Sequence, residues 1–288
     1  MNMQRYEDRY FQSSDGQRLY FRDYAASLAN HPTPVLCLPG LTRNSKDFET
    51  LANVLANERR VISPDLRGRG LSEYDCDWRN YHPAQYMADI LLLLEQLEVS
   101  RVVIVGTSLG GWMAMLMSHE RPEAVTGVVL NDIGPEANAE GLARVVNTTG
   151  TLETVDRFSD AIQQTRSCYE IAFPDWSDEQ WHRYTQSTYR ERSDGKFDLD
   201  YDRNIGRAAR EGVSGIRQEP WQMFDSLSKK PALLLHGTLS DILTDDIIVK
   251  MRDHKPDLRV ATVPNRGHAP LLDEQEAIDA ITDFIARL

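Results

Sequence analysis

Short apolar segments alternate with longer segments of helical period along most of this chain. The apolar segments are rich in β-branched residues, and several are continuously apolar, which is typical of strands buried on both faces of a parallel sheet. We therefore expect strands at Val35–Leu38, Arg60–Ser63, Val102–Gly106, Val125–Asn131, Ala232–His236 and Arg259–Val263.

The intervening segments have the spacing of amphipathic helices. In Pro83–Glu98, apolar residues recur on one helical face, and the proline suits the first turn. The opening stretch Tyr10–Tyr24 alternates around Ser14-Asp15-Gly16, which indicates a hairpin. Strands that alternate with helices predict an α/β fold, with a mostly parallel central sheet and helices on both faces. The other expected helices are Lys46–Asn57, Leu109–His119, Thr244–Asp253 and Glu274–Leu288.

One long stretch interrupts this alternation. Residues 134–227 contain no buried-strand run but many aromatic residues in polar, helix-like segments, and the alternation resumes at Pro231. This pattern predicts a mostly helical insertion, a cap, between two strands of one sheet. The expected organisation is a core formed by residues 1–133 and 228–288 and a cap formed by residues 134–227.

Composition and charge exclude several classes of partner. The 288 residues include 32 Lys and Arg against 44 Asp and Glu, a net charge of −12. Such a surface repels phosphate backbones and anionic lipid headgroups, so we expect neither a nucleic-acid nor a membrane partner. The start has no secretory signal pattern, and the longest strongly apolar run, Ile90–Leu94, is far short of the ~20 residues that cross a bilayer. A cytoplasmic protein is therefore expected.

Cysteine and histidine spacing gives no support for a metal or another cofactor. The three cysteines have no paired spacing, and neither a CxxC nor an HExxH motif is present. An odd number of cysteines in a chain without a signal is typical of reduced thiols. No cofactor is expected.

The segment Gly106-Thr107-Ser108-Leu109-Gly110-Gly111 follows one expected strand and opens an expected helix. A serine on such a tight turn has its hydroxyl lifted clear of the sheet, and the flanking glycines allow strand and helix to approach closely. The Leu109 amide at the helix N-terminus would point to where a negative oxygen develops. Ser108 is therefore the candidate nucleophile.

A serine nucleophile needs a histidine base and a carboxylate that orients it. Of seven histidines, His268 stands out because it lies in the loop between the last expected strand and the last helix. Asp241, in the loop after Ala232–His236, is the expected carboxylate. Asp132, directly after Val125–Asn131, is the main alternative, and Asp245 and Asp246 are weaker ones at a helix start.

These residues, in the order Ser, Asp, His, give the chain a resemblance to the α/β-hydrolase superfamily from about Tyr10 to the C-terminus. Leu38-Pro39-Gly40-Leu41-Thr42 resembles the loop that supplies the family's second oxyanion-hole amide, with proline where members commonly have histidine. The resemblance implies that Leu41 and Leu109 form that hole. Pro64–Ser72 resembles the family's Asp-x-Arg-Gly-x-Gly-x-Ser loop, in which we expect Asp65 and Arg67 to brace each other.

The resemblance implies a serine hydrolase that cleaves a carboxylic ester or lactone through an acyl-enzyme. The expected substrate is small to medium in size and largely apolar. Trp112, Trp176 and Trp181 are candidates to line its pocket, although each could equally pack in the core. Related alternatives are carbon–carbon bond hydrolysis of ring-cleavage dienones and cofactor-free perhydrolysis. A ligand receptor that keeps the three site residues is an alternative of another class, and the oligomeric state stays open.

Overall fold

A computed structural model describes residues 5–27, 32–213 and 215–288. Its centre is a sheet with strand order β1-β2-β4-β3-β5-β6-β9-β10. The first two strands form the antiparallel hairpin expected around Ser14-Asp15-Gly16, and β2 also pairs antiparallel with β4. The remaining pairs are parallel, so the carboxyl ends of β3 to β10 lie along one edge. The strands are β1 (Glu7–Gln12), β2 (Arg18–Tyr24), β3 (Val35–Leu38), β4 (Val61–Pro64), β5 (Val102–Thr107), β6 (Val125–Asn131), β9 (Ala232–Gly237) and β10 (Arg259–Val263).

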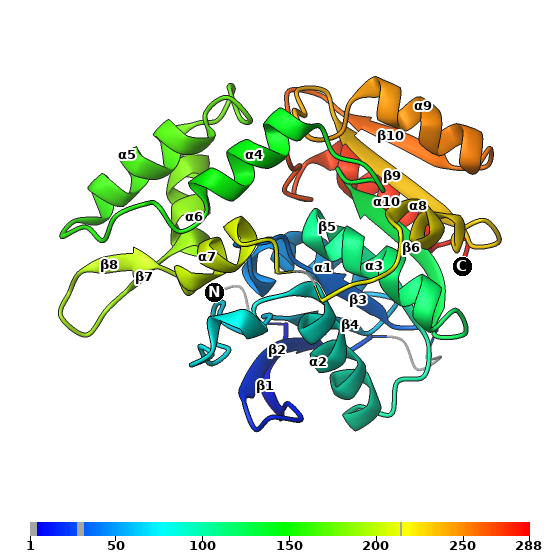
Figure 1. Ribbon diagram of the computed structural model, residues 1–288, viewed down its shortest axis with the longest axis horizontal. Coiled ribbons are helices and arrows are strands. Elements are labelled where there is room, and N and C mark those ends of the chain that lie inside the picture. The colour runs from blue at the N-terminus through cyan, green and yellow to red at the C-terminus, as the bar shows by residue number, and fades with distance from the viewer. Residues whose placement is uncertain (1–4, 28–31, 214) are drawn as a thin grey trace.

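Alternate residues of each strand face the two sides of the sheet, and helices cover both sides (Figure 1). On β3, Val35 and Cys37 pack in one apolar cluster, whereas Leu36 and Leu38 pack in the other. The first cluster is completed by α1 (Glu49–Leu55) and α10 (Gln275–Ile285). The second is completed by α2 (Pro83–Gln96), α3 (Leu109–Glu120), α8 (Pro220–Asp225) and α9 (Asp245–His254). Burial on both faces explains why central strands such as β3 and β5 are continuously apolar. The mostly parallel sheet between two helical layers confirms the predicted α/β fold.

The expected helix at Lys46–Asn57 begins with a short 3-10 turn, η1 (Ser45–Phe48), before α1. Asn44 caps this turn, because its side chain accepts a hydrogen bond from the Lys46 amide. A second 3-10 turn, η2 (Trp78–Asn80), precedes α2, which starts at Pro83. None of the helices among the described residues is long and apolar enough to cross a membrane.

The stretch between β6 and β9 contains most of the structure outside the sheet layers. It comprises α4 (Ala139–Thr148), α5 (Phe158–Tyr169), α6 (Asp178–Thr188), β7 (Tyr189–Glu191), β8 (Phe197–Leu199) and α7 (Asn204–Arg210), followed by α8. In Figure 1 these elements up to α7 lie beyond the carboxyl edge of the sheet, whereas α8 packs on α3. The antiparallel β7–β8 hairpin is an element that the expectation of helices did not include.

Candidate active site

Ser108 occupies a strained turn between β5 and α3. Its φ of 50° lies in the left-handed region, which costs a residue with a side chain of order 1–3 kcal/mol. The turn needs glycine on both sides. A Cβ on Gly106 would lie 2.4 Å from the Gly110 carbonyl, and one on Gly110 would lie 2.0 Å from the Leu38 oxygen. Strand and helix therefore approach as closely as the sequence motif predicts.

His268 lies against the serine, as the order of elements predicts. Its Nε2 is 2.8 Å from Ser108 Oγ. The loop that carries it is tied to the sheet by Asn131, whose side chain donates to the Pro270 carbonyl at 2.8 Å. Gly267 is needed for a close approach, because a Cβ there would lie 2.8 Å from Ala172.

The carboxylate that contacts His268 belongs to Asp132, so the assignment of Asp241 to this position is wrong in the structure. Asp132 Oδ2 is 2.9 Å from His268 Nδ1. The carboxylate is fully buried and also accepts hydrogen bonds from the Gly237 amide and the Ser240 hydroxyl. Three partners therefore fix its orientation toward the imidazole.

Asp241 points elsewhere because the insert supplies a competing cation. Arg144, on α4, donates to both of its carboxylate oxygens, at 2.5 and 2.7 Å. Partial burial alone would raise the pKa of Asp241, but the hydrogen bonds from Arg144 outweigh it and hold that pKa below its usual value. Asp245 and Asp246 lie in the first turn of α9, as expected.

The two amides expected to form an oxyanion hole lie beside the serine. Leu109 is the first residue of α3, and both Leu41 and Leu109 contribute to the pocket walls around Ser108. Among the described residues, neither amide has a hydrogen-bond acceptor. Both N–H groups are thus free to donate to a substrate oxygen.

Arg69, and not the residue at position 39, holds the loop that carries Leu41. This guanidinium is fully buried, and its Nε and Nη2 donate to the Leu41 carbonyl at 2.9 and 2.8 Å. The Leu41 carbonyl belongs to the peptide bond with Thr42, so Arg69 holds Leu41 from its carboxyl side, one peptide bond after the Leu41 amide. Sequence reasoning did not assign Arg69 any role.

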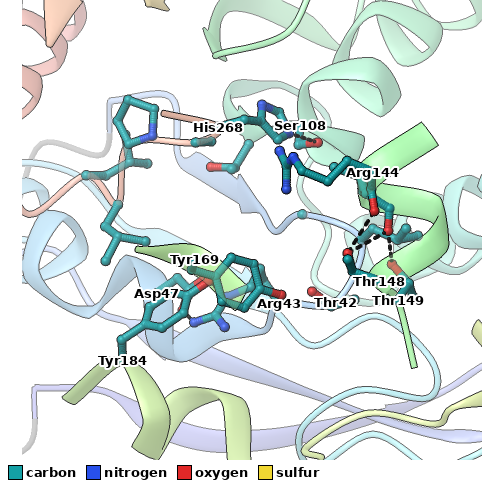
Figure 2. Close-up of a pocket in the computed structure, with 18 of the residues that line it drawn as sticks. Thr42, Arg43, Asp47, Ser108, Arg144, Thr148, Thr149, Tyr169, Tyr184 and His268 are labelled. Atoms are coloured by element: carbon teal, nitrogen blue, oxygen red, sulfur yellow. Dashed lines mark hydrogen bonds and ion pairs between the residues drawn. The ribbon is translucent and has the colours of Figure 1, made fainter. Parts of the chain in front are cut away.

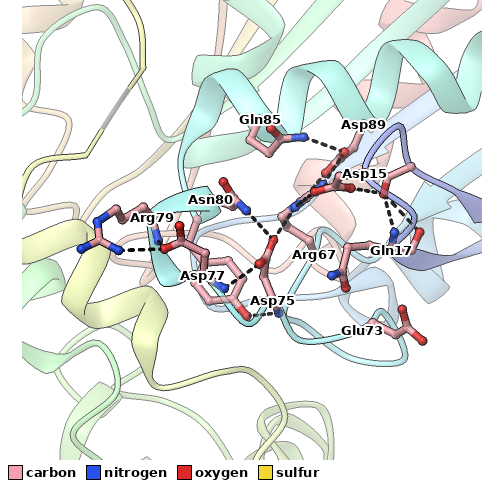
Figure 3. Close-up of polar contacts among 12 residues, drawn as sticks. Asp15, Gln17, Arg67, Glu73, Asp75, Asp77, Arg79, Asn80, Gln85 and Asp89 are labelled. Carbon is pink, nitrogen blue, oxygen red and sulfur yellow. Dashed lines mark hydrogen bonds and ion pairs between the residues drawn. The ribbon is translucent and has the colours of Figure 1, made fainter.

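Asp65 and Arg67 do not brace each other, contrary to expectation. Asp65 accepts from the Ser45 and Leu71 amides at 2.7 and 2.9 Å, which closes the turn after β4. Arg67 instead contacts the carboxylates of Asp15, Asp75 and Asp89, as Figure 3 shows. The loop is structural, but its two charged residues stabilise different neighbours.

Ser108 lies between two pockets of different character. The first, called here the polar pocket, also contains His268 and is shown in Figure 2. The apolar pocket adjoins Leu109 on the other side. Polar residues in the walls of the polar pocket include Thr42, Arg43, Arg144, Thr148, Tyr169 and Tyr184, beside apolar ones such as Phe48 and Leu271. The walls of the apolar pocket are mainly apolar and include Trp112, Ile133, Leu142, Val146, Ile205 and Val213, with Glu136 at one place.

Of the three tryptophans considered for the pocket, only Trp112 lines one that contains Ser108. Trp176 stacks on Phe173, with ring centroids 3.8 Å apart, and meets Trp181 edge to face at 4.7 Å. Trp181 is 1% exposed. Both side chains therefore form an aromatic core that holds α5 and α6 together, so their expected place in the pocket is wrong in the structure.

Most charged and phenolic groups of the polar pocket are already neutral or paired. Arg43 donates to both oxygens of Asp47, at 2.7 and 2.6 Å, and lies over the ring of Tyr184. Burial raises the pKa of Tyr184 to about 12, despite the opposing Arg43 charge, and burial also raises the pKa of Tyr169 well above its usual value. Both phenols therefore stay protonated at neutral pH.

No group of three or more His, Cys, Asp or Glu side chains in the described ranges is arranged to hold a metal ion. The site residues that sequence reasoning missed or ranked too low are Asp132, Arg69 and Arg144. Only Asp132 had a usable signal: it follows β6 directly, and β6 is the neighbour of the strand that ends at Ser108.

Comparisons with known proteins found relatives that match most or all of the chain. The solved structure of an alpha/beta hydrolase from Novosphingobium aromaticivorans DSM 12444 is 41% identical, covers both chains fully and superposes with a TM-score of 0.93. A 3-hydroxybutyrate-oligomer hydrolase from Cupriavidus necator is 28% identical over 88% of each chain. A 2-(acetamidomethylene)succinate hydrolase from Mesorhizobium japonicum is 27% identical over 87% of each chain.

The family model for the alpha/beta hydrolase fold matches residues 33–275. This range begins just before β3 and ends at the start of α10, so it includes Ser108, Asp132 and the loop that carries His268. The chain therefore belongs to the alpha/beta hydrolase fold family.

Proposed function

We propose that this chain is a serine hydrolase that cleaves carboxylic esters or lactones through an acyl-enzyme. The observation that carries the proposal is the continuous contact from Ser108 Oγ through His268 to the buried Asp132 carboxylate. Serine is a weak nucleophile unless a base removes its proton, and a base works best when a third group holds it. The relatives named hydrolases support the same reaction class.

In the proposed acylation, Ser108 Oγ attacks the carbonyl carbon while His268 Nε2 takes the hydroxyl proton. Asp132 stabilises the resulting imidazolium. The carbonyl oxygen becomes an anion, which the Leu41 and Leu109 amides bind; removing one such donor costs about 3–4 kcal/mol of transition-state stabilisation in measured cases. His268 then returns the proton to the departing alcohol oxygen as the carbon–oxygen bond breaks.

Deacylation repeats these steps with water as the nucleophile. His268 takes a proton from water, the hydroxide oxygen adds to the acyl carbon, and the tetrahedral species collapses to release the acid. The serine oxygen leaves with the proton held by His268. The net reaction adds one water across the ester bond and needs no electron transfer.

The test is hydrolysis of p-nitrophenyl esters from acetate to decanoate, and of several lactones, by the wild-type protein and Ser108→Ala. We expect turnover that the substitution lowers by at least about 10⁴-fold. The acyl length with the highest turnover would indicate the size of the pocket that binds the acyl chain. Turnover retained by the variant would disprove the serine mechanism. Turnover of a vinylogous diketone with esters left intact would favour carbon–carbon hydrolysis.

A further inference from the structure

Arg144 extends from the insert into the polar pocket. It lies in the middle of α4, and its side chain lines the same pocket as Ser108 and His268. In Figure 2 its guanidinium reaches from α4 toward these two residues. A permanent positive charge beside a nucleophile is a feature that simple ester hydrolysis does not require.

The position of Arg144 is fixed by a close contact between α4 and the loop after β9. The Asn138 amide, at the start of the helix, donates to the Ile242 carbonyl at 2.9 Å. A Cβ on Gly141 would lie 2.1 Å from the Asp241 carbonyl oxygen, so only glycine permits this approach. The Asp241 carboxylate then binds the Nε–Nη2 edge of the guanidinium. Backbone packing and a two-point ion pair together hold the side chain in place.

This arrangement leaves one nitrogen of Arg144 open. The two N–H groups of its Nη1 have no hydrogen-bond acceptor among the described residues, and the side chain is 29% exposed. Arg43 differs, since its guanidinium donates to Asp47, Ser187 and Thr188. The acidic group in the pocket, Asp47, is occupied by Arg43. Arg144 is therefore the charged donor that a ligand can reach.

The contacts of His268 indicate which part of a substrate meets Arg144. The imidazole that takes the serine proton must return it to the leaving oxygen, so the leaving alcohol lies on the side of His268. His268 lines the polar pocket, whereas the walls of the apolar pocket contain Trp112 and other apolar side chains. The acyl chain then occupies the apolar pocket, and the alcohol portion occupies the pocket that contains Arg144.

We propose that Arg144 binds a carboxylate on the alcohol portion of the substrate, which makes the preferred substrates esters of hydroxy acids. This inference rests on the proposed serine hydrolase function and narrows its substrate class. Nη2 uses one of its two N–H groups on Asp241, so the open edge formed by Nη1 and Nη2 offers parallel N–H donors that match a carboxylate. Asp241 is a positioning residue, which holds the opposite edge of Arg144 and so directs the open nitrogen into the pocket.

The experiment compares butanoyl esters of hydroxyethanoate, 4-hydroxybutanoate and 6-hydroxyhexanoate with the corresponding primary amides. Each pair differs in the charge at one end and shares its acyl group and its chain. Release of butyrate gives kcat/KM for both members. Because a hydrogen bond to a charged group contributes about ten- to a hundredfold in affinity, we expect the acid to be preferred by that factor at the best chain length.

Variants then assign the preference to a residue. Arg144→Met keeps the aliphatic stem and should lower the acid-to-amide ratio to about one. Arg157→Met is the matched control, since Arg157 is an exposed arginine of the same insert, paired with Asp160; it should keep the wild-type ratio. Asp241→Asn should raise KM for the acid by about three- to tenfold with little change in kcat, because a looser Arg144 still carries its charge. Melting temperatures check that each variant folds.

A ratio near one in the wild type at every chain length, or a ratio that Arg144→Met leaves unchanged, would overturn the proposal. A binding measurement separates this failure from failure of the proposed function. Calorimetry with all three acid esters should show that Ser108→Ala binds one or more of them at least tenfold more tightly than Ser108→Ala/Arg144→Met does. If the wild type hydrolyses no ester while this difference persists, the hydrolase proposal is wrong and the carboxylate site stands.

Discussion

Charged side chains cluster in two regions of the molecule. The regions differ in whether every N–H donor of their arginine side chains already has a hydrogen-bond acceptor. Around Arg67, every N–H of the guanidinium meets a carboxylate oxygen of Asp15, Asp75 or Asp89 (Figure 3). In the polar pocket, Arg144 retains an open nitrogen. A saturated network can only stabilise the fold, whereas an unsaturated donor beside a nucleophile is available to a substrate.

The hydrogen bonds of this saturated network also explain how its charged side chains can be buried away from water. Arg67 is fully buried and connects the β1–β2 turn, the loop after β4 and helix α2. Asn80 and Gln85 add donors to the carboxylates of Asp75 and Asp89. The carboxylates outnumber the arginine, and these neutral donors help to satisfy the excess.

Of the changes that test this comparison, Asp132→Asn has the largest expected effect. An amide in place of the carboxylate disturbs the orientation and the proton position of His268, so we expect kcat for p-nitrophenyl butanoate to fall by about 10³–10⁴-fold. Asp241→Asn is the matched control and should lower kcat by less than about tenfold. Steady-state kinetics on both variants make the comparison, and a larger loss for Asp241→Asn would contradict the assignment.

Arg67→Met tests the saturated region. Removing the cation leaves Asp75 and Asp89 buried without their partner, which costs about 3–5 kcal/mol of unfolding free energy. Urea denaturation measures it. Arg79→Met, in the exposed pair with Asp77, should change stability by less than about 0.5 kcal/mol. If Arg67→Met instead lowered kcat and left stability intact, the distinction between the two regions would fail.

Arg69→Lys tests the residue that connects the two regions. Lysine cannot reproduce the two hydrogen bonds to the Leu41 carbonyl, so the loop that carries the Leu41 amide is held less firmly. We expect kcat to fall by about 10–100-fold with little change in KM. Arg59→Lys is the control, because Arg59 also donates to backbone carbonyls but lies away from both pockets. A change confined to KM would show that Arg69 acts on binding instead.

Asp15→Asn has the smallest expected effect. Hydrogen bonds from Arg67 lower the pKa of Asp15 from 3.8 to about 2, so its contribution to stability is present above pH 3.8 and is lost as the pH falls toward 2. Because the side chain is 40% exposed, we expect a loss of less than about 1 kcal/mol at pH 7. Unfolding curves of wild type and variant should converge between about pH 4 and pH 2; a constant difference would contradict this reading.

The parts of the molecule that were predictable from sequence are those set by local patterns. Buried strands need continuous apolar runs, and the Ser108 turn needs Gly106 and Gly110 for steric reasons. Both features can therefore be recognised in the sequence. Distance from a strand end does not determine loop conformation. Asp132 and Asp241 both follow strands of the same edge, and only the folded loops show that Ser240 turns toward the first and Arg144 toward the second.

The insert was less predictable for a related reason. Its aromatic residues could pack on one another or face a ligand, and composition does not distinguish the two. Trp176 and Trp181 form a core between helices, whereas Trp112, on the regular helix α3, lines a pocket. No local sequence pattern identified Arg144 as a site residue, because its position depends on Asp241, which lies 97 positions further along the chain.

The central claim is that esters are cleaved through an acyl group on Ser108. The most direct measurement is the product ratio when methanol competes with water during hydrolysis of phenyl, p-chlorophenyl and p-nitrophenyl butanoate, which share one acyl group. An acyl-enzyme predicts one ratio of methyl ester to acid for every activated leaving group, since all pass through the same intermediate. A ratio that changes with the leaving group would contradict it and indicate direct attack by water.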